Sequence, residues 1–471
     1  MSVLANQNIP VHNPCGGGGT CGKCVIRTSE GIKLACQTYV TDGMEIFPSQ
    51  NAHEDFSALD TYVSQRPFTY DCSNGYGIAI DIGTTTLAYE LTDLSTGKRL
   101  LTYSSANSQR NLGADVITRI KKATQGAQDE LHAYIIGDIR RGITHILEKS
   151  ALPADAISFV SVAGNTTMLH LLQNMPCNTL GTYPFVPVDI SMRRCAFSQV
   201  IGDELPGAEL IILPGISTFV GADIVAGILC CNPQNRFAPN LLIDLGTNGE
   251  MALFTHDRIL ATSTAAGPAF EAGNISCGTA SIPGAIAKVR YSPENNVFIY
   301  ETIDNRPAIG ICGTGVMDIA AELVLHGLAD ETGRLADEYF DNGVVIAKGL
   351  TFTQKDMREI QLAKSAVRSG IEILLDVAGY SYNDIDKVYL AGGFGHKINI
   401  DSAVALGLIP STLAGKVVTV GNTALGGATH VLVSSIAEAD VVALAGRAEE
   451  INLSAHPRFN DLFMEHMMFY M

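Results

Sequence analysis

Four cysteines near the start of the chain have the spacing of ligands for a metal ion or an iron–sulfur cluster. They are Cys15, Cys21, Cys24 and Cys36. The pattern is C-x5-C-x2-C, and the fourth cysteine follows after eleven more residues. Three ligands must lie close together, and glycine lets a backbone fold tightly enough to aim its N–H groups at the sulfurs. The glycines at 16–19 and 22 stand where this is needed.

Zinc is the alternative metal for these four cysteines. Zinc sites usually pair one C-x2-C with a second C-x2-C or with histidines, and only Cys21 and Cys24 fit that pattern. The cluster therefore favours iron–sulfur over zinc. Strands predicted at 25–28 and 32–35, joined by a turn at 29–31, would bring Cys36 to the other ligands.

A second kind of chemistry is indicated by two similar segments, 77–88 and 241–252, which read GIAIDIGTTTLA and LLIDLGTNGEMA. Glycine at a hairpin tip lets the backbone approach phosphate oxygens, which N–H groups and threonine hydroxyls then bind. The aspartates of these segments, Asp81 and Asp244, repel phosphate. They suit Mg²⁺ coordination, usually through water, or the orientation of an attacking water. Two copies indicate a duplicated fold with a nucleotide in the cleft between the halves.

Two further glycine-rich turns follow predicted strands. Segment 388–395 reads VYLAGGFG, and a strand end without Cβ atoms can lie flat against a nucleobase. Segment 310–315 reads GICGTG and runs into 316–326, which has helical apolar spacing. Helix N-termini attract phosphate or ribose oxygens. The predicted nucleotide-binding residues are Gly83, Thr84, Thr85, Thr86, Gly246, Thr247, Asn248, Gly313, Thr314, Gly315, Gly392, Gly393 and Phe394.

The alternative for each Asp-x-Gly-Thr segment is a plain hairpin turn, since Asp and Gly are common turn formers. The occurrence of two copies on buried strands favours phosphate binding. Two other residues are weighed in the same way. His170 lies in an apolar helical stretch, which is typical of a core histidine, and Asn165 ends a buried strand at 159–163 and is expected to face the cleft.

Composition limits the class of protein. The 471 residues suffice for about three domains, and the 46% hydrophobic share indicates a folded globular protein. The formal net charge of −17 argues against a nucleic-acid partner, which needs clustered Lys and Arg. No stretch reaches the ~18 apolar residues of a membrane span, and residues 1–13 lack the pattern of a signal peptide. We therefore expect a cytoplasmic protein without a membrane partner.

The expected domain organisation follows from these segments. Residues 1–49 form the cysteine domain, and 50–74 form a polar linker without firm periodicity. Residues 75–471 form the nucleotide-binding domain, with a first half at about 75–238 and a second at about 239–471.

The four nucleotide segments occur in an order that resembles the superfamily of acetate and sugar kinases, Hsp70 and actin. DIGTTT is similar to its first phosphate loop, DLGTNG to the second and LAGGFG to its adenosine motif. The GTG turn resembles that of activators of acyl-CoA dehydratases and reductases. The resemblance implies an α/β ATPase with two lobes around a nucleotide cleft, with ATP and Mg²⁺ as cofactors and Asp81 and Asp244 in catalytic roles.

The cysteine segment resembles a [2Fe–2S] ferredoxin of the β-grasp type, both in GTCGKC and in LACQT around Cys36. This implies a [2Fe–2S] cluster bound by the four cysteines. The first gap holds five residues, where plant-type ferredoxins have four. Only fourteen residues precede Cys15, although a β-grasp domain normally opens with a hairpin. We therefore expect a small, shortened β-grasp domain.

Three more segments, AAGPAFE at 265–271, NISCG at 274–278 and QLAKSA at 361–366, resemble reductive activators of corrinoid enzymes. Such proteins join an N-terminal [2Fe–2S] domain to this ATPase fold and return Co(II) to Co(I) at the expense of ATP. The resemblance implies electron transfer to a corrinoid protein or corrinoid-dependent methyltransferase, which regenerates Co(I) for methyl transfer. An upstream electron donor is a further expected partner, and a homodimer stays open.

Three alternative functions stay open. A small-molecule kinase with a redox-sensing cluster would need a general base beside its acceptor hydroxyl, which the sequence does not place. An activator ATPase of another low-potential reductase or dehydratase is the second. The third is an Hsp70-like binding protein, in which ATP only switches the affinity for a partner.

Overall fold

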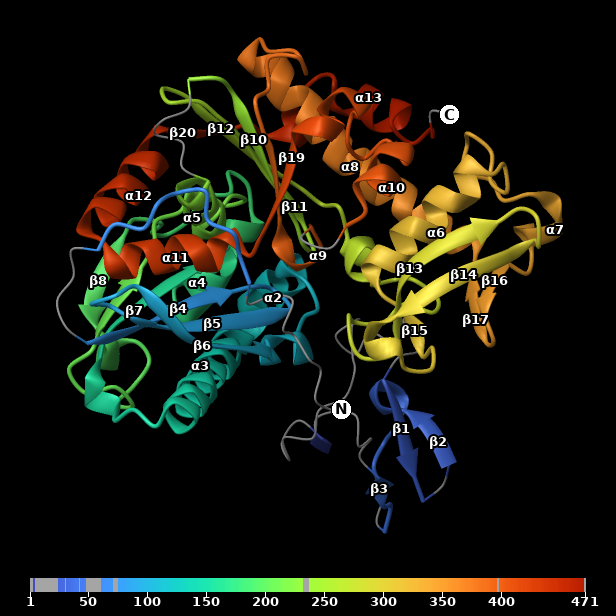
Figure 1. Cartoon of the computed structure of the whole chain (residues 1–471). Helices are drawn as coiled ribbons and strands as arrows, with labels where there is room; N and C mark the ends of the chain where they lie inside the picture. Colours follow the sequence, from blue (N-terminus) through green and yellow to red (C-terminus); the bar gives the residue numbers. More distant parts are fainter. Residues whose placement is uncertain are drawn as a thin grey trace.

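The computed structural model describes most of the chain (Figure 1). The described residues are 3–4, 24–29, 31–41, 43–47, 61–70, 75–231, 237–395 and 398–469. Two of the predicted cluster ligands, Cys15 and Cys21, lie outside these ranges.

A small antiparallel sheet follows Cys24 and includes Cys36 in the turn after its second strand. In strand order it consists of β2 (Gly31–Leu34), β1 (Val25–Thr28) and β3 (Ile46–Phe47). The predicted strand–turn–strand unit is confirmed to within one residue at its ends. Among the described residues, the apolar side chains buried together here are Leu4, Cys24, Ile26 and Ala35.

Two six-stranded sheets carry the two Asp-x-Gly-Thr segments. The first consists, in strand order, of β6 (Lys98–Ala106), β5 (Thr86–Asp93), β4 (Tyr76–Ile82), β7 (Ile157–Gly164), β9 (Glu209–Ile212) and β8 (Arg193–Ala196). The second consists, in strand order, of β19 (Val417–Gly421), β18 (Val388–Ala391), β10 (Asn240–Leu245), β11 (Gly249–Phe254), β12 (Ile259–Thr264) and β20 (Ala448–Glu450).

The two sheets repeat one topology over five strands. In each sheet the strand that carries the aspartate, β4 or β10, begins an antiparallel three-strand meander. Two parallel strands extend the other side, β7 and β9 in the first sheet and β18 and β19 in the second. The repeat confirms the duplication that the two similar segments predict.

Helices cover the faces of both sheets. Those of the first lobe are α2 (Val116–Lys122), α3 (Gln128–Ser150), α4 (Thr166–Leu172) and α5 (Ala222–Cys230). Those that follow β18 are α9 (Gly392–Gly395), α10 (Ile400–Ala405), α11 (Thr423–Val433), α12 (Ser435–Arg447) and α13 (Phe459–Glu465). The long α8 (Gln354–Ala378) packs on β11 and β12. Within the described part of the chain, no helix combines the length and the apolar character that crossing a membrane requires.

Helix α11 comes late in the sequence but lies on the first sheet, as Figure 1 shows, and α12 packs against α11 and α5. Leu425 and Leu432 of α11 share one buried cluster with Ile78 and Ile80 of β4. Helix α5 contacts strands of both sheets and packs along α11. One of the two large hydrophobic clusters therefore contains residues from both sides of position 238, while the other contains only residues that follow it.

The second lobe contains additional elements between β12 and β18. They are β13 (Ala285–Ser292), β14 (Val297–Thr302), β15 (Gly310–Ile311), α6 (Gly313–Leu325), α7 (Asp337–Phe340), β16 (Val344–Ala347) and β17 (Leu350–Phe352). The predicted strand-to-helix turn at 310–315 is the junction of β15 and α6.

His170 is the core histidine that the sequence predicts. Its side chain is fully buried in α4. One ring nitrogen lies 2.8 Å from the carbonyl oxygen of Thr166, and the other accepts a hydrogen bond of 3.0 Å from the N–H of Val188. Both nitrogens are thus used in the fold.

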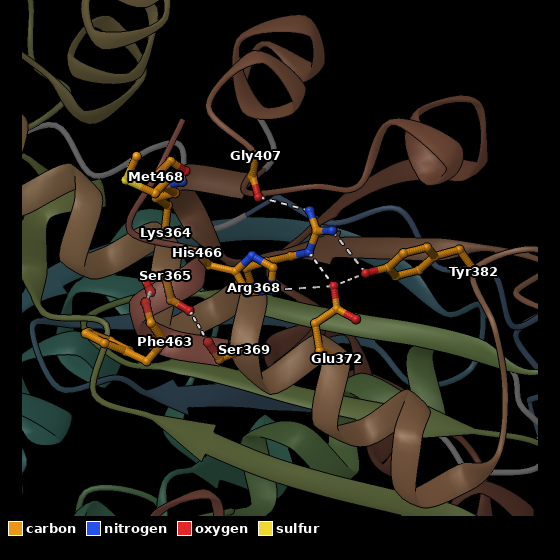
Figure 2. A network of polar contacts seen from close by, with 10 residues as sticks. All are labelled: Lys364, Ser365, Arg368, Ser369, Glu372, Tyr382, Gly407, Phe463, His466 and Met468. Atoms are coloured by element: carbon orange, nitrogen blue, oxygen red, sulfur yellow. Dashed lines mark hydrogen bonds and ion pairs between the residues drawn. The ribbon is translucent and has the colours of Figure 1, made fainter. Parts of the chain in front are cut away.

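The QLAKSA segment lies on α8 and binds the C-terminal residues of the chain (Figure 2). Gln361 donates to the carbonyl of Met467 at 2.8 Å, and Lys364 donates to that of Met468 at 2.5 Å. The Lys364 ammonium also lies 4.6 Å from the centre of the buried Phe469 ring. These contacts hold the segment after α13 against α8.

We predict that Lys364→Met removes a pH dependence of stability. Burial lowers the pKa of the Lys364 ammonium to about 7, whereas the unfolded chain keeps the proton up to about 10.5. Between these values the unfolded state binds more protons, so the free energy of unfolding rises with pH by at most about 1.4 kcal/mol per unit. Thermal unfolding from pH 7 to 10 should show this rise in the wild type and a flatter profile in Lys364→Met. The control is Lys288→Met at an exposed lysine, and equal slopes in all three proteins would contradict the prediction.

Candidate functional site

The tips of the two Asp-x-Gly-Thr hairpins meet. The Thr85 hydroxyl, between β4 and β5, lies 3.4 Å from the Thr247 hydroxyl, between β10 and β11. Two segments more than 160 residues apart thus form one site, in which the two lobes contribute one loop each.

The first loop closes through a hydrogen bond of 3.0 Å from the N–H of Gly83 to the carbonyl of Thr86. A Cβ atom at Gly83 would lie 2.7 Å from that carbonyl oxygen, so only glycine fits there. The Asn165 amide caps α4 and donates to the Thr84 hydroxyl at 3.1 Å. The prediction that Asn165 faces the cleft agrees with this contact.

Two buried polar residues donate hydrogen bonds to carbonyl groups of the first loop. Sequence reasoning missed both residues. The Arg119 guanidinium donates to the carbonyls of Thr84, at 2.5 Å, and of Gly113, at 2.9 Å. The Asn107 amide donates to the carbonyl of Gly83 at 2.9 Å. Neither Arg119 nor Asn107 has measurable exposure, so the loop carbonyls are fixed by donors that water does not reach.

The second loop is bonded to acidic residues. Thr247 donates to a Glu271 carboxylate oxygen at 3.0 Å, and Asn248 donates to Glu250 at 3.2 Å. Gly392, at the end of β18, has a φ of +86°, and a Cβ atom there would lie 2.7 Å from the Asp244 carboxylate. The glycine segment predicted to meet a nucleobase therefore begins directly against Asp244.

Five carboxyl groups surround the two loops. They are Asp81, Asp223, Asp244, Glu250 and Glu271. Burial, together with a smaller effect of the Asp223 charge, raises the pKa of Asp81 to about 7 and that of Asp244 to about 8. Burial likewise raises the pKa of Asp223 to about 6 and shifts the pKa values of Glu250 and Glu271 upward. The Asn422 amide, which donates to Asp81 at 2.8 Å, opposes the shift of the Asp81 pKa.

This arrangement has the chemistry of a divalent-cation and phosphate site. Crowded carboxyl groups with raised pKa values are stabilised in their ionised form by a cation, and Mg²⁺ prefers oxygen ligands. Threonine hydroxyls and hairpin N–H groups supply donors for phosphate oxygens beside them. No three of the described acidic, histidine or cysteine side chains are grouped so as to hold a metal ion by themselves.

The remaining predicted nucleotide residues are only partly connected to this site. The Thr314 hydroxyl donates to the carbonyl of Ala287 at 2.8 Å, and Gly315 packs on Ile286. The start of α6 contacts the short helix Pro268–Glu271, which carries Glu271 to Thr247. Gly393 lies in α9 next to Gly392, and the side chain of Phe394 lies outside what the structure describes.

The two described N-terminal cysteines lie side by side. The sulfurs of Cys24 and Cys36 are 3.1 Å apart, and the N–H of Cys36 points at the Cys24 sulfur at 3.4 Å. A disulfide would need about 2.05 Å, so the two sulfurs are not joined by one. Converging thiols with a backbone N–H on sulfur fit an iron–sulfur cluster, for which the other two predicted ligands lie outside the described residues.

Comparison with known families matches two consecutive models to most of the chain. The model described as the middle region of RACo matches residues 76–236. The model described as the C-terminal domain of RACo, the ASKHA domain, matches residues 238–471.

Two curated relatives and one solved structure are similar over most of their length. The corrinoid activation enzyme RamQ of Eubacterium limosum is 29% identical over 574 residues, with 99% of this chain and 95% of the relative covered. The [Co(II) methylated amine-specific corrinoid protein] reductase of Methanosarcina barkeri is 29% identical over 423 residues, with 83% of this chain and 76% of the relative covered. A solved structure titled reductive activator for corrinoid, iron–sulfur protein superposes with a TM-score of 0.78 at 26% identity and covers all of this chain and 95% of the other.

Proposed function

Since this chain belongs to the family of reductive activators of corrinoid proteins with an ASKHA domain, we propose that it reduces an inactive Co(II) corrinoid on a partner protein to Co(I) and uses ATP to drive the transfer. One curated relative is named a corrinoid activation enzyme, and the other is named a reductase of a Co(II) corrinoid protein. The partner is therefore a corrinoid protein or a corrinoid-dependent methyltransferase.

The electron leaves from the cysteine domain in this proposal. A [2Fe–2S] cluster held by Cys15, Cys21, Cys24 and Cys36 supplies a one-electron redox centre when bound. Co(II) takes up one electron to become Co(I), and an upstream donor resupplies that electron. The two described thiols support this role because they converge without forming a disulfide.

The cleft binds ATP with Mg²⁺ in this proposal. The loops around Thr85 and Thr247 hold phosphate oxygens, and Asp81 and Asp244 hold the hydrated Mg²⁺. Asp223 is the proposed base for the attacking water. It lies in the first turn of α5, and the N–H of Ile224 donates to its carboxylate at 2.9 Å, which stabilises the ionised form.

ATP is needed because the reduction of Co(II) to Co(I) is uphill from ordinary cellular donors. Each ~1.4 kcal/mol changes a population tenfold, so a few such units make the transfer productive. Closure of the two lobes on ATP would change how the corrinoid partner is docked, and hydrolysis would release it. The contact between Thr85 and Thr247 is the main support for this proposal, because it brings one loop of each lobe together beside the carboxyl groups.

Reconstitution with candidate corrinoid proteins tests this function. The cluster is rebuilt anaerobically and reduced, and Co(I) absorption is followed with ATP, with ADP and without nucleotide. We expect Co(I) to accumulate only with ATP, together with ADP and free phosphate. A phosphorylated small molecule in place of free phosphate would favour the kinase alternative. If ATP is hydrolysed but none of the candidate corrinoid proteins is reduced to Co(I), the Hsp70-like alternative would be favoured.

A further inference from the structure

Residues 61–66, which follow the cysteine domain, lie against the nucleotide-binding lobes next to the candidate ATP site. The sequence assigns them to a linker, yet their backbone is paired on two sides. Val63 donates to the carbonyl of Val420 at 2.9 Å, and Tyr62 forms an antiparallel bridge with Gly421. On the other side, the N–H groups of Gln65 and Arg66 donate to the carbonyl of Cys230, where α5 ends.

Side chains anchor the same residues. The Tyr62 hydroxyl donates to the buried Glu90 at 3.0 Å, and the Arg99 guanidinium lies over the Tyr62 ring. Arg66 is almost fully buried and pairs with Asp440 of α12 at 2.7 Å. Segment 61–66 is therefore a packed part of the first lobe.

Asn422 connects this segment to the ATP site. Its backbone N–H donates to the carbonyl of Thr61 at 2.9 Å. Its side chain caps α11 by accepting from the N–H of Leu425 at 2.9 Å, and its amide donates to the Asp81 carboxylate at 2.8 Å. The preceding residue, Gly421, has a φ of +70°, and a Cβ atom there would lie 2.3 Å from the Thr61 oxygen. Thr61 thus fixes the turn from which the Asn422 side chain extends.

We propose that Asn422 is a positioning residue for Asp81 in ATP hydrolysis and that segment 61–66 sets its position. This inference rests on the proposed function, because it requires Asp81 to act on ATP. The amide holds one oxygen of Asp81, which leaves the other for hydrated Mg²⁺. Since Thr61 continues toward the cysteine domain, displacement of this segment would change the geometry at Asp81.

The first test separates positioning from helix capping. Asn422→Ser keeps an N-cap oxygen but is too short to reach Asp81. We expect a folded protein with α11 still capped and a kcat for ATP hydrolysis lower by about ten- to a hundredfold, with little change in KM, because a hydrogen bond to a charged group is lost. The matched control is Asn452→Ser, which keeps a cap oxygen at an exposed N-cap. A wild-type kcat in Asn422→Ser would overturn the role of the amide.

The second test moves the segment without changing a cleft side chain. Gly421→Ala places a methyl group against the Thr61 oxygen, whereas Gly349→Ala has a similar φ of +77° and nothing within 4 Å. Both variants carry the same backbone strain. We expect a kcat loss of about tenfold in Gly421→Ala only. Equal activity of the two variants would overturn the role of segment 61–66, and Asn422→Ser still decides the role of the amide if Gly421→Ala does not fold.

The wild type measured in the same series separates the two levels of inference. A wild type that forms Co(I) with ATP while the variants hydrolyse ATP normally would overturn only the inference on Asn422. A wild type that hydrolyses ATP without forming Co(I) would overturn the proposed function. The comparison of kcat between the variants and the wild type would then still decide the role of Asn422. A wild type without ATP hydrolysis would overturn both.

Discussion

Asp81→Ala abolishes ATP-dependent Co(I) formation and leaves the visible absorption of the reconstituted cluster unchanged, as we expect from the separation of the two sites. Asp81 lies at the end of β4 among carboxyl groups that suit Mg²⁺, and burial raises its pKa to about 7. Loss of such a group should lower ATP hydrolysis by about 10²- to 10⁴-fold. The cluster absorption should remain because Cys24 and Cys36 pack in a small core apart from the two large hydrophobic clusters of the lobes.

Stopped-flow or steady-state absorption of Co(I) measures the loss of ATP-dependent cobalt reduction. The visible spectrum of the reconstituted variant alone measures whether the cluster absorption is unchanged. Asp257→Ala is the control, since the Asp257 side chain is 89% exposed on the second lobe, in the turn between β11 and β12. If Co(I) still accumulated with ATP in Asp81→Ala, the coupling of ATP to electron transfer would be wrong.

Cys24→Ala should produce the opposite defect. We expect loss of the visible absorption and of electron transfer to Co(II), because a cluster deprived of one thiolate loses a ligand. ATP hydrolysis should persist, since the loops around Thr85 and Thr247 are unchanged. Iron content, absorption and phosphate release together measure the effect.

Cys36→Ser removes a second predicted cluster ligand, the one that follows β2, and should give the same defect. Cys195→Ser is the control, because Cys195 is a half-buried cysteine of the first lobe. Full absorption in both Cys24→Ala and Cys36→Ser would refute the assignment of these cysteines. One equivalent of zinc and no visible absorption in the wild type would favour the zinc alternative.

Local patterns in the sequence predict much of the nucleotide site. The aspartate hairpins, the glycine turn after β18 and the junction of β15 and α6 all lie where their residues predict them. Each is a short motif whose conformation depends on its own glycines and apolar residues. His170 was predictable for the same reason, because its neighbours in α4 are apolar.

The residues that complete the site carry no such local signal. Arg119, Asp223 and Asn422 lie on three different helices or helix starts and reach the loops only through tertiary packing. Glu250 and Glu271 lie within segments 241–252 and 265–271, but nothing in the spacing of those segments indicates that their carboxyl groups turn toward the loops. Residues 61–66 pair mainly through backbone groups, which leave no periodicity in the sequence. The domain boundaries, the cluster ligands outside the described residues and the roles of the site residues stay predictions.

The anchoring of Thr61 beside β19 limits where the electron can be delivered. Fourteen peptide units separate Phe47, at the end of β3, from Thr61, and that many residues span at most about 50 Å. In the proposed function, a corrinoid partner bound to the lobes would therefore meet the cluster at an effective concentration set by this maximum distance, instead of the concentration of the protein in the cell. Lengthening or shortening the tether would change the rate of cobalt reduction without altering either site.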